Sequence, residues 1–158
     1  MNLKNTLEQV FQKLNGFIED YNSRCEEEGG LRIKKQTLLI VGQMALFLAD
    51  LPFPITATTD LDINSELKDN VRNKLREELT PLGISLDPDG RKIWMPERTR
   101  HHIFFDSPCL QVRFADPEDV LLSKYKFNRP DDQRLIKTYL EYYPGFEQVI
   151  KNSGIKRK

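Results

Sequence analysis

The sequence predicts a mixed α/β (α+β) domain in which a sheet is flanked by helices and followed by further helices. Apolar residues recur at helical spacing between residues 3 and 24, which indicates one long amphipathic helix. The short apolar run 37–41 ends at Gly42 and is typical of a buried strand. Prolines at positions 117, 130 and 144 stand where helices are expected to start, so the last part of the chain should be helical.

The remaining elements follow from turn and helix-start signals. Asp87-Pro88-Asp89-Gly90 separates two short runs, so residues 84–86 and 92–95 are predicted to form a β-hairpin. Ser65 is expected to cap a helix over residues 66–80, which Gly83 ends. The other expected helices are 44–50, 116–127, 130–142 and 144–152, and the other expected strands are 60–63, 103–105 and 110–114.

Length and composition indicate one soluble domain. The chain has 158 residues, of which 39% are apolar and 30% charged, so a core without disulfides is expected. We expect a single domain over residues 1–158, with the sheet in 1–115 and a helical part in 116–158. The 24 basic and 24 acidic residues cancel, which argues against a strong overall attraction to nucleic acid.

Cysteine usage and the absence of long apolar runs bear on location. Cys25 and Cys109 lie far apart and have no metal-ligand spacing, which indicates a reducing compartment. The longest apolar runs are far shorter than the roughly 20 residues that a membrane span needs. The sequence therefore predicts a cytoplasmic protein without a membrane partner.

The pair Asp60 and Asp62 is the feature most closely tied to chemistry. Alternate side chains of a strand share one face, so both carboxylates should point the same way while Leu61 points to the core. Two close carboxylates repel each other unless a cation lies between them, and Mg²⁺ (or Mn²⁺) prefers such oxygen ligands. Gly42, at a strand-to-helix turn, offers bare backbone to a triphosphate. The alternative is a solvated strand face, or Asp62 capping the next helix.

Two stretches of the sequence resemble a known family. The stretch from Leu38 to Ile63, with V-G-Q-M-A-L-F-L and then T-T-D-L-D-I, resembles the minimal nucleotidyltransferases of the DNA polymerase beta superfamily. That family has G-G or G-S after the first strand, then a helix, then T-x-D-[ILV]-D on the second strand. A later stretch, Asp116 to Lys124 followed by R-P-D-D, resembles a segment of a small bacterial branch akin to abortive-infection and antitoxin-type domains. The resemblance spans about residues 5–140 and implies a nucleotidyltransferase-like fold.

The resemblance implies a set of catalytic residues. Asp60 and Asp62 would hold Mg²⁺ against the phosphates of a nucleoside triphosphate, and Lys124 would direct a cation at them. Active members have a third acid on a later strand that activates the attacking hydroxyl. Asp106 is the nearest candidate for this acid.

The resemblance also implies a nucleotide-binding set. Asp132 is expected to orient Lys124 or Arg129, and the backbone near Gly42 would hold the outer phosphates. The sequence departs from the family at Gln43, where a glycine or serine is usual, and lacks the arginine often found before T-x-D. The full nucleotide-binding set is Gly42, Gln43, Thr59, Lys124, Arg129 and Asp132.

Two functional hypotheses follow. The first is a metal-dependent nucleotidyltransferase that moves a nucleotidyl group from a nucleoside triphosphate to a hydroxyl of an RNA, a protein or a small molecule. The second is a catalytically degenerate domain of the same fold that binds a protein partner, such as a component of a toxin–antitoxin pair. A non-catalytic nucleic-acid binder is less favoured because the net charge is zero.

Three further features have less specific interpretations. Adjacent His101 and His102 should face opposite sides of a strand, so a shared metal is disfavoured. Trp94 could stack on a base, although packing on its own domain is the favoured interpretation. The basic tail 151–158 is expected to be a solvated terminus.

Overall fold

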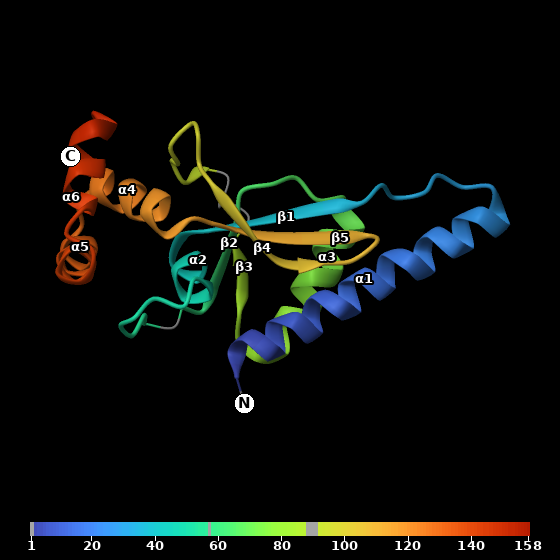
Figure 1. Ribbon diagram of the computed structural model, residues 1–158. Coiled ribbons are helices and arrows are strands. Elements are labelled where there is room, and N and C mark those ends of the chain that lie inside the picture. The colour runs from blue at the N-terminus through green and yellow to red at the C-terminus, as the bar shows by residue number, and fades with distance from the viewer. Residues whose placement is uncertain (1, 57, 88–91) are drawn as a thin grey trace.

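A five-stranded mixed sheet forms the centre of the computed structural model, which describes residues 2–56, 58–87 and 92–158 (Figure 1). The strands are β1 (Gln36–Val41), β2 (Asp60–Ile63), β3 (Ser85–Asp87), β4 (His101–Asp106) and β5 (Leu110–Ala115). Their order is β3-β2-β1-β5-β4. β1 runs parallel to β5 and antiparallel to β2, while β3 runs parallel to β2 and β4 antiparallel to β5.

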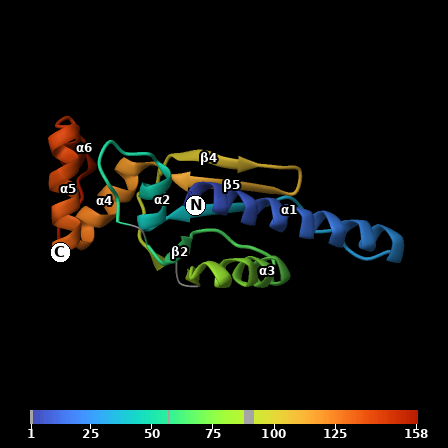
Figure 2. The same ribbon diagram turned by 90° about the horizontal axis from the view of Figure 1, so that it is seen from below.

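Helices cover one face and one end of this sheet. They are α1 (Leu3–Glu28), α2 (Gly42–Leu48), α3 (Asp69–Leu79), α4 (Pro117–Phe127), α5 (Pro130–Tyr142) and α6 (Phe146–Ser153). α1 and α3 contact each other on the same side of the sheet, and α4, α5 and α6 gather at one end of the molecule (Figures 1 and 2). None of the helices in the described part of the chain has both the length and the apolar composition that crossing a membrane requires. The mixed sheet with flanking helices confirms the predicted α/β class.

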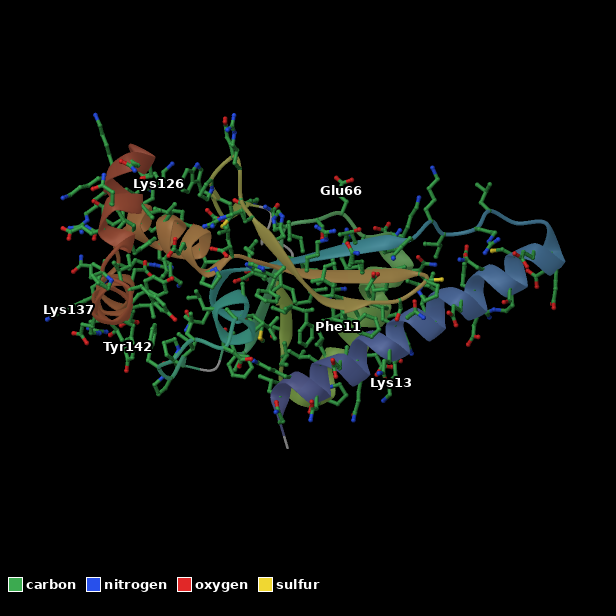
Figure 3. The ribbon with its side chains drawn as sticks, in the orientation of Figure 1. Phe11, Lys13, Glu66, Lys126, Lys137 and Tyr142 are labelled. Atoms are coloured by element: carbon green, nitrogen blue, oxygen red, sulfur yellow. The ribbon has the colours of Figure 1, made fainter. Side chains whose placement is uncertain are left out.

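The core lies between the sheet and α1. Phe11 of α1 is fully buried against the rings of Phe104 and Phe105, whose centroids lie 6.0 and 6.1 Å from its own (Figure 3). On β1, Leu38 and Ile40 are also fully buried, as the period of two of a strand with one face on the core requires. The apolar residues that recur along α1 and along β1 are therefore buried in the same core.

α1 is longer than predicted and extends beyond the sheet (Figure 1). It continues through Glu28, beyond the predicted end at residue 24, and is capped by Gly29. The segment that returns to β1 is tied to the helix by the buried Asn22. Its side-chain amide donates to the Ile33 carbonyl at 3.0 Å and accepts from the Ile33 N–H at 2.7 Å.

The predicted helix start at Ser65 is wrong. α3 begins at Asp69, after an N-cap at Lys68. The hydroxyl of Ser65 instead accepts a hydrogen bond from the backbone N–H of Leu39 on β1, at 3.0 Å. Since a serine hydroxyl can serve a neighbouring strand as well as a helix end, tertiary contact decides which of the two it does.

The predicted hairpin is also wrong in its second strand. β3 pairs in parallel with β2, and residues 92–95 do not form a strand. Residues 88–90 of the expected turn lie outside the described residues. The carbonyl of Trp94 accepts a hydrogen bond from the hydroxyl of Ser123 at 2.6 Å, so this segment is held against α4 rather than against β3.

The basic tail is exposed at every residue from 151 to 158 except the half-buried Ile155, as expected of a solvated terminus, but its last residues also contact α4. α6 ends at Gly154, whose φ of +68° lies in the left-handed region that glycine adopts readily. Residues 155–158 then return to α4. There the N–H of Lys158 donates to the Lys126 carbonyl at 3.1 Å, and the Arg157 guanidinium lies 4.5 Å from the ring centroid of Tyr125.

Candidate functional site

Three carboxylates lie together at the ends of β2 and β3. Asp60 is exposed and Asp62 half-buried, whereas Leu61 between them is fully buried, as the alternation of a strand predicts. The parallel pairing of β3 with β2 places Asp87 opposite Asp62. Asp87 follows the buried Leu86, so its side chain lies on the same side of the sheet as the Asp60–Asp62 pair.

Gly42 has a residue-specific role beside these acids. Its φ is +70°, in the left-handed region that residues with a Cβ adopt only at a cost. A Cβ at this position would lie 2.6 Å from Oδ2 of Asp62. The glycine therefore permits both the turn from β1 into α2 and the close approach of the Asp62 carboxylate to the backbone.

The electrostatics of Asp62 are those of a crowded carboxylate. Burial, a hydrogen bond with Asp87 and the negative charges of Asp87 and Asp60 raise the pKa of Asp62 to about 6, and Lys124 opposes this rise. Two carboxyl groups can share a hydrogen bond only if one of them holds a proton, so the pair retains a proton that an isolated aspartate would lose. A cation placed between the two oxygens removes the same repulsion.

The donor set fits a hard divalent cation such as Mg²⁺. It consists of carboxylate oxygens, and bare backbone at Gly42 leaves room beside Asp62. Within residues 2–56, 58–87 and 92–158, no group of three His, Cys, Asp or Glu side chains is already arranged as a metal site.

The raised pKa of Asp62 predicts a stability that falls as pH rises. The folded-state pKa of about 6 lies above the ordinary 3.8, so between these values the native state binds more protons than the unfolded state. Urea unfolding in the presence of EDTA measures this effect. Between about pH 4.5 and about pH 7.5, the free energy of unfolding of the wild type should fall by about 1–2 kcal/mol more than that of Asp62→Asn. Parallel pH profiles of the two proteins would contradict the crowding of these carboxylates.

A basic group faces the acids from α4 and α5. Asp132 is almost fully buried and accepts a hydrogen bond from the Arg129 Nε at 2.9 Å. The ammonium of Lys124 lies 3.5 Å from the other oxygen of Asp132, and its side chain is only 14% exposed. Asp132 thus contacts both Lys124 and Arg129, the two side chains of which it was expected to orient one or the other. Lys124 also lies near enough to Asp62 to lower the pKa of that carboxyl.

Two adjoining cavities contain nearly all of the predicted site residues. A cavity of about 570 Å³ holds the carboxylates and the cations; it is lined by Gly42, Gln43, Asp60, Asp62, Asp87, Lys92, Ile93, Ser123, Lys124, Phe127, Arg129 and Lys158. A cavity of about 940 Å³ shares Gln43, Lys124 and Arg129 with it and includes Thr59 and Asp132. The structure therefore brings together all nucleotide-binding candidates and three of the four catalytic ones.

Gln43 occupies the boundary between the two cavities. Its side-chain amide donates to the Thr56 carbonyl at 3.1 Å and so fixes the loop that leads into β2. At this position the family that the sequence resembles has a small residue. Here the longer side chain holds the loop rather than leaving the backbone bare.

Asp106 does not join the site. It lies on β4, at the opposite edge of the sheet from β3. It pairs with Gln111, which pairs with Thr37 at the far end of β1 from the Gly42 turn. A hydrogen bond from Lys35 at 2.7 Å lowers the pKa of Asp106. The expectation that Asp106 completes the acidic set is therefore wrong, because strand order separates it from Asp60 and Asp62.

Sequence reasoning missed Asp87 and Lys158. In the sequence, Asp87 begins a predicted hairpin turn, because Pro88, Asp89 and Gly90 follow it. The signal that could have identified it is the alternation of Ser85, Leu86 and Asp87, which places an acid one residue after a core position. No local pattern pointed to Lys158, since only the return of the tail to α4 brings it to the cavity.

The histidines and the tryptophan lie outside the acidic cavity. His102 contacts Oδ1 of Asp116 through Nε2 at 2.7 Å and stacks near Phe114. Trp94 packs within its own domain, with the Lys126 ammonium 4.1 Å from its ring centroid. The contact of Trp94 supports the packing interpretation of that residue.

No protein-family model, curated protein or solved structure matches the chain.

Proposed function

We propose that the protein is a metal-dependent nucleotidyltransferase that moves a nucleotidyl group from a nucleoside triphosphate to a hydroxyl acceptor. The observation that carries the proposal is the cluster of Asp60, Asp62 and Asp87 on two adjacent strands, with Gly42 beside it and Lys124 in the same cavity. The strand-helix-strand arrangement of β1, α2 and β2 supports the resemblance to nucleotidyltransferase-like folds.

In the proposed site, the acidic residues bind the metal and the basic residues bind the phosphates. Asp60 and Asp62 are the ligands for Mg²⁺, which when bound supplies positive charge to the phosphates. Lys124, held by the buried Asp132, adds a fixed cation to the same cavity. Arg129 is more exposed and contacts the same carboxylate, so it serves phosphate groups nearer to solvent.

Asp87 completes the acidic set that the proposed reaction needs. The acceptor hydroxyl attacks the α-phosphorus, a new P–O bond forms, and the bond to the β-phosphate oxygen breaks. Pyrophosphate leaves with the electron pair of that bond, and Asp87 takes the proton of the hydroxyl. The proposed reaction uses two carboxylates to hold the metal and a third as the base, and the site holds three.

Calorimetry with excess Mg²⁺ and each of ATP, GTP, CTP and UTP tests the binding step. We expect heat with at least one triphosphate in the wild type, and none in Asp60→Asn/Asp62→Asn. Asp69→Asn is the matched control, because its carboxylate is 93% exposed on α3 outside the site. The absence of heat with all four triphosphates in the wild type would refute the proposal.

The alternative is a degenerate domain of the same fold that binds a protein partner, as in a toxin–antitoxin pair. The specific observation in its favour is Gln43, whose side chain holds the loop at the phosphate position. Incubation with α-³²P-labelled triphosphates and total RNA or lysate protein separates the two proposals. Label transfer above that of Asp60→Asn/Asp62→Asn supports the enzyme, and a stable co-purifying protein without label transfer supports the alternative.

A further inference from the structure

Two hydrogen bonds of the Lys158 backbone attach the segment formed by residues 155–158 to α4, in addition to contacts of its side chains. The N–H of Lys158 donates to the Lys126 carbonyl at 3.1 Å, and its carbonyl accepts from the Asn128 side chain at 3.4 Å. The carbonyls in the last turn of a helix have no partner within the helix, so the tail supplies one to α4. The docking of the tail therefore does not depend on the charge of the Lys158 side chain.

Aromatic residues of α4 hold two of the three basic side chains of the tail, Arg157 and Lys158, on different sides. Arg157 lies over Tyr125, next to a cavity lined by α4 and α5. The Lys158 ammonium lies 5.1 Å from the ring centroid of Phe127, and both residues line the cavity that holds Asp60 and Asp62. Lys126, between the two aromatic residues in the sequence, contacts Trp94 instead.

The charge of this cavity is divided between acids and bases. Asp60, Asp62 and Asp87 contribute the acids, and Lys92, Lys124, Arg129 and Lys158 contribute the bases. Lys124 and Arg129 are held by Asp132. Among the described residues the Lys158 ammonium has no carboxylate partner, and an aromatic face holds a cation more weakly than an anion does.

We propose that Lys158 is a phosphate-binding residue of the nucleotide site, brought there by the return of residues 155–158 to α4. This inference rests on the proposed function, since it names a further residue of the same site. A triphosphate in the cavity offers the Lys158 ammonium a stronger partner than the Phe127 ring. The tail is then one wall of the binding site rather than an appendage.

Calorimetric titration of the full chain with Mg²⁺ and ATP, GTP, CTP or UTP tests this role. For the triphosphate that wild type binds, Lys158→Met should raise Kd by about tenfold, and Lys158→Arg should restore most of the affinity. Lys156→Met is the matched control, because Lys156 is an exposed lysine of the same tail and should leave Kd unchanged. Thermal unfolding should give the same Tm for all four proteins, which separates lost phosphate contact from lost packing.

Two results would overturn the inference, and only the second of them would also refute the proposed function. If wild type binds a triphosphate and Lys158→Met binds it within twofold as tightly, the role of Lys158 is refuted while the proposed function stands. If wild type binds none of the four triphosphates, the proposed function is refuted and the role of Lys158 falls with it.

Discussion

Replacing Asp87 by asparagine is expected to lower the rate of nucleotidyl transfer by about 100- to 1,000-fold, because the acceptor hydroxyl loses the group that takes its proton. Asparagine retains the shape of the side chain but cannot act as a base. Triphosphate binding should weaken much less, since Asp60, Asp62 and Lys124 remain in the cavity. Single-turnover label transfer, measured beside calorimetric binding, separates the two effects.

Asp106→Asn is the matched control for this experiment. Asp106 is the acid that the sequence suggested, but it lies on β4 and pairs with Lys35 at the opposite edge of the sheet. Its replacement should leave the transfer rate unchanged. A loss of activity in Asp106→Asn together with full activity in Asp87→Asn would reverse the assignment of the third acid.

Gly42→Ala is expected to lower stability and to abolish Mg²⁺-dependent triphosphate binding. The left-handed conformation alone costs about 1–2 kcal/mol for a residue with a Cβ. The new methyl group would also lie 2.6 Å from Oδ2 of Asp62, so that carboxylate must move from its position beside Asp87. Urea unfolding measures the first effect, and calorimetry with Mg²⁺ and triphosphate measures the second.

Gly83→Ala separates backbone strain from the clash at the site. Gly83 has a φ of +71°, close to the +70° of Gly42, but a Cβ there meets no atom within 4 Å. It should lose stability and keep triphosphate binding. Adding Asp62→Ala to Gly42→Ala removes the contacted oxygen and should recover the stability that the clash costs, without recovering binding. Equal loss of binding in both alanine variants would show that the clash with Asp62 is not the cause.

Features that depend on the local backbone, such as the alternation of side chains along a strand, were predictable from the sequence. Two acids separated by one apolar residue on a strand must share a face, and Asp60 and Asp62 do so because Leu61 is in the core. Prolines in first helical turns marked α4 and α5 to the residue or nearly so, since proline fits where no backbone donor is needed. Such rules depend only on the local backbone.

Features decided by strand pairing were not predictable in the same way. Asp-Pro-Asp-Gly after Leu86 is a sound turn signal, yet β3 finds its partner in β2, a strand earlier in the chain. That pairing brings Asp87 to Asp62, whereas the order of β5 and β4 takes Asp106 to the other edge. Strand order therefore decides whether Asp87 or Asp106 is the third acid of the site. Neighbouring residues carry no information about it.

The parallel pairing of β1 with β5 has a consequence for the order of folding. This pairing joins Gln36 to Leu110, so the whole chain between these two residues is enclosed in a loop when the contact forms. Closing so long a loop costs conformational entropy before the contact can stabilise the fold. β2 reaches β1 through a much shorter connection, and β3 reaches β2 in turn. During synthesis on a ribosome, β1, β2 and β3, which carry the acidic residues, can therefore pair before β4 and β5 have emerged. The core is completed only when β5 pairs with β1.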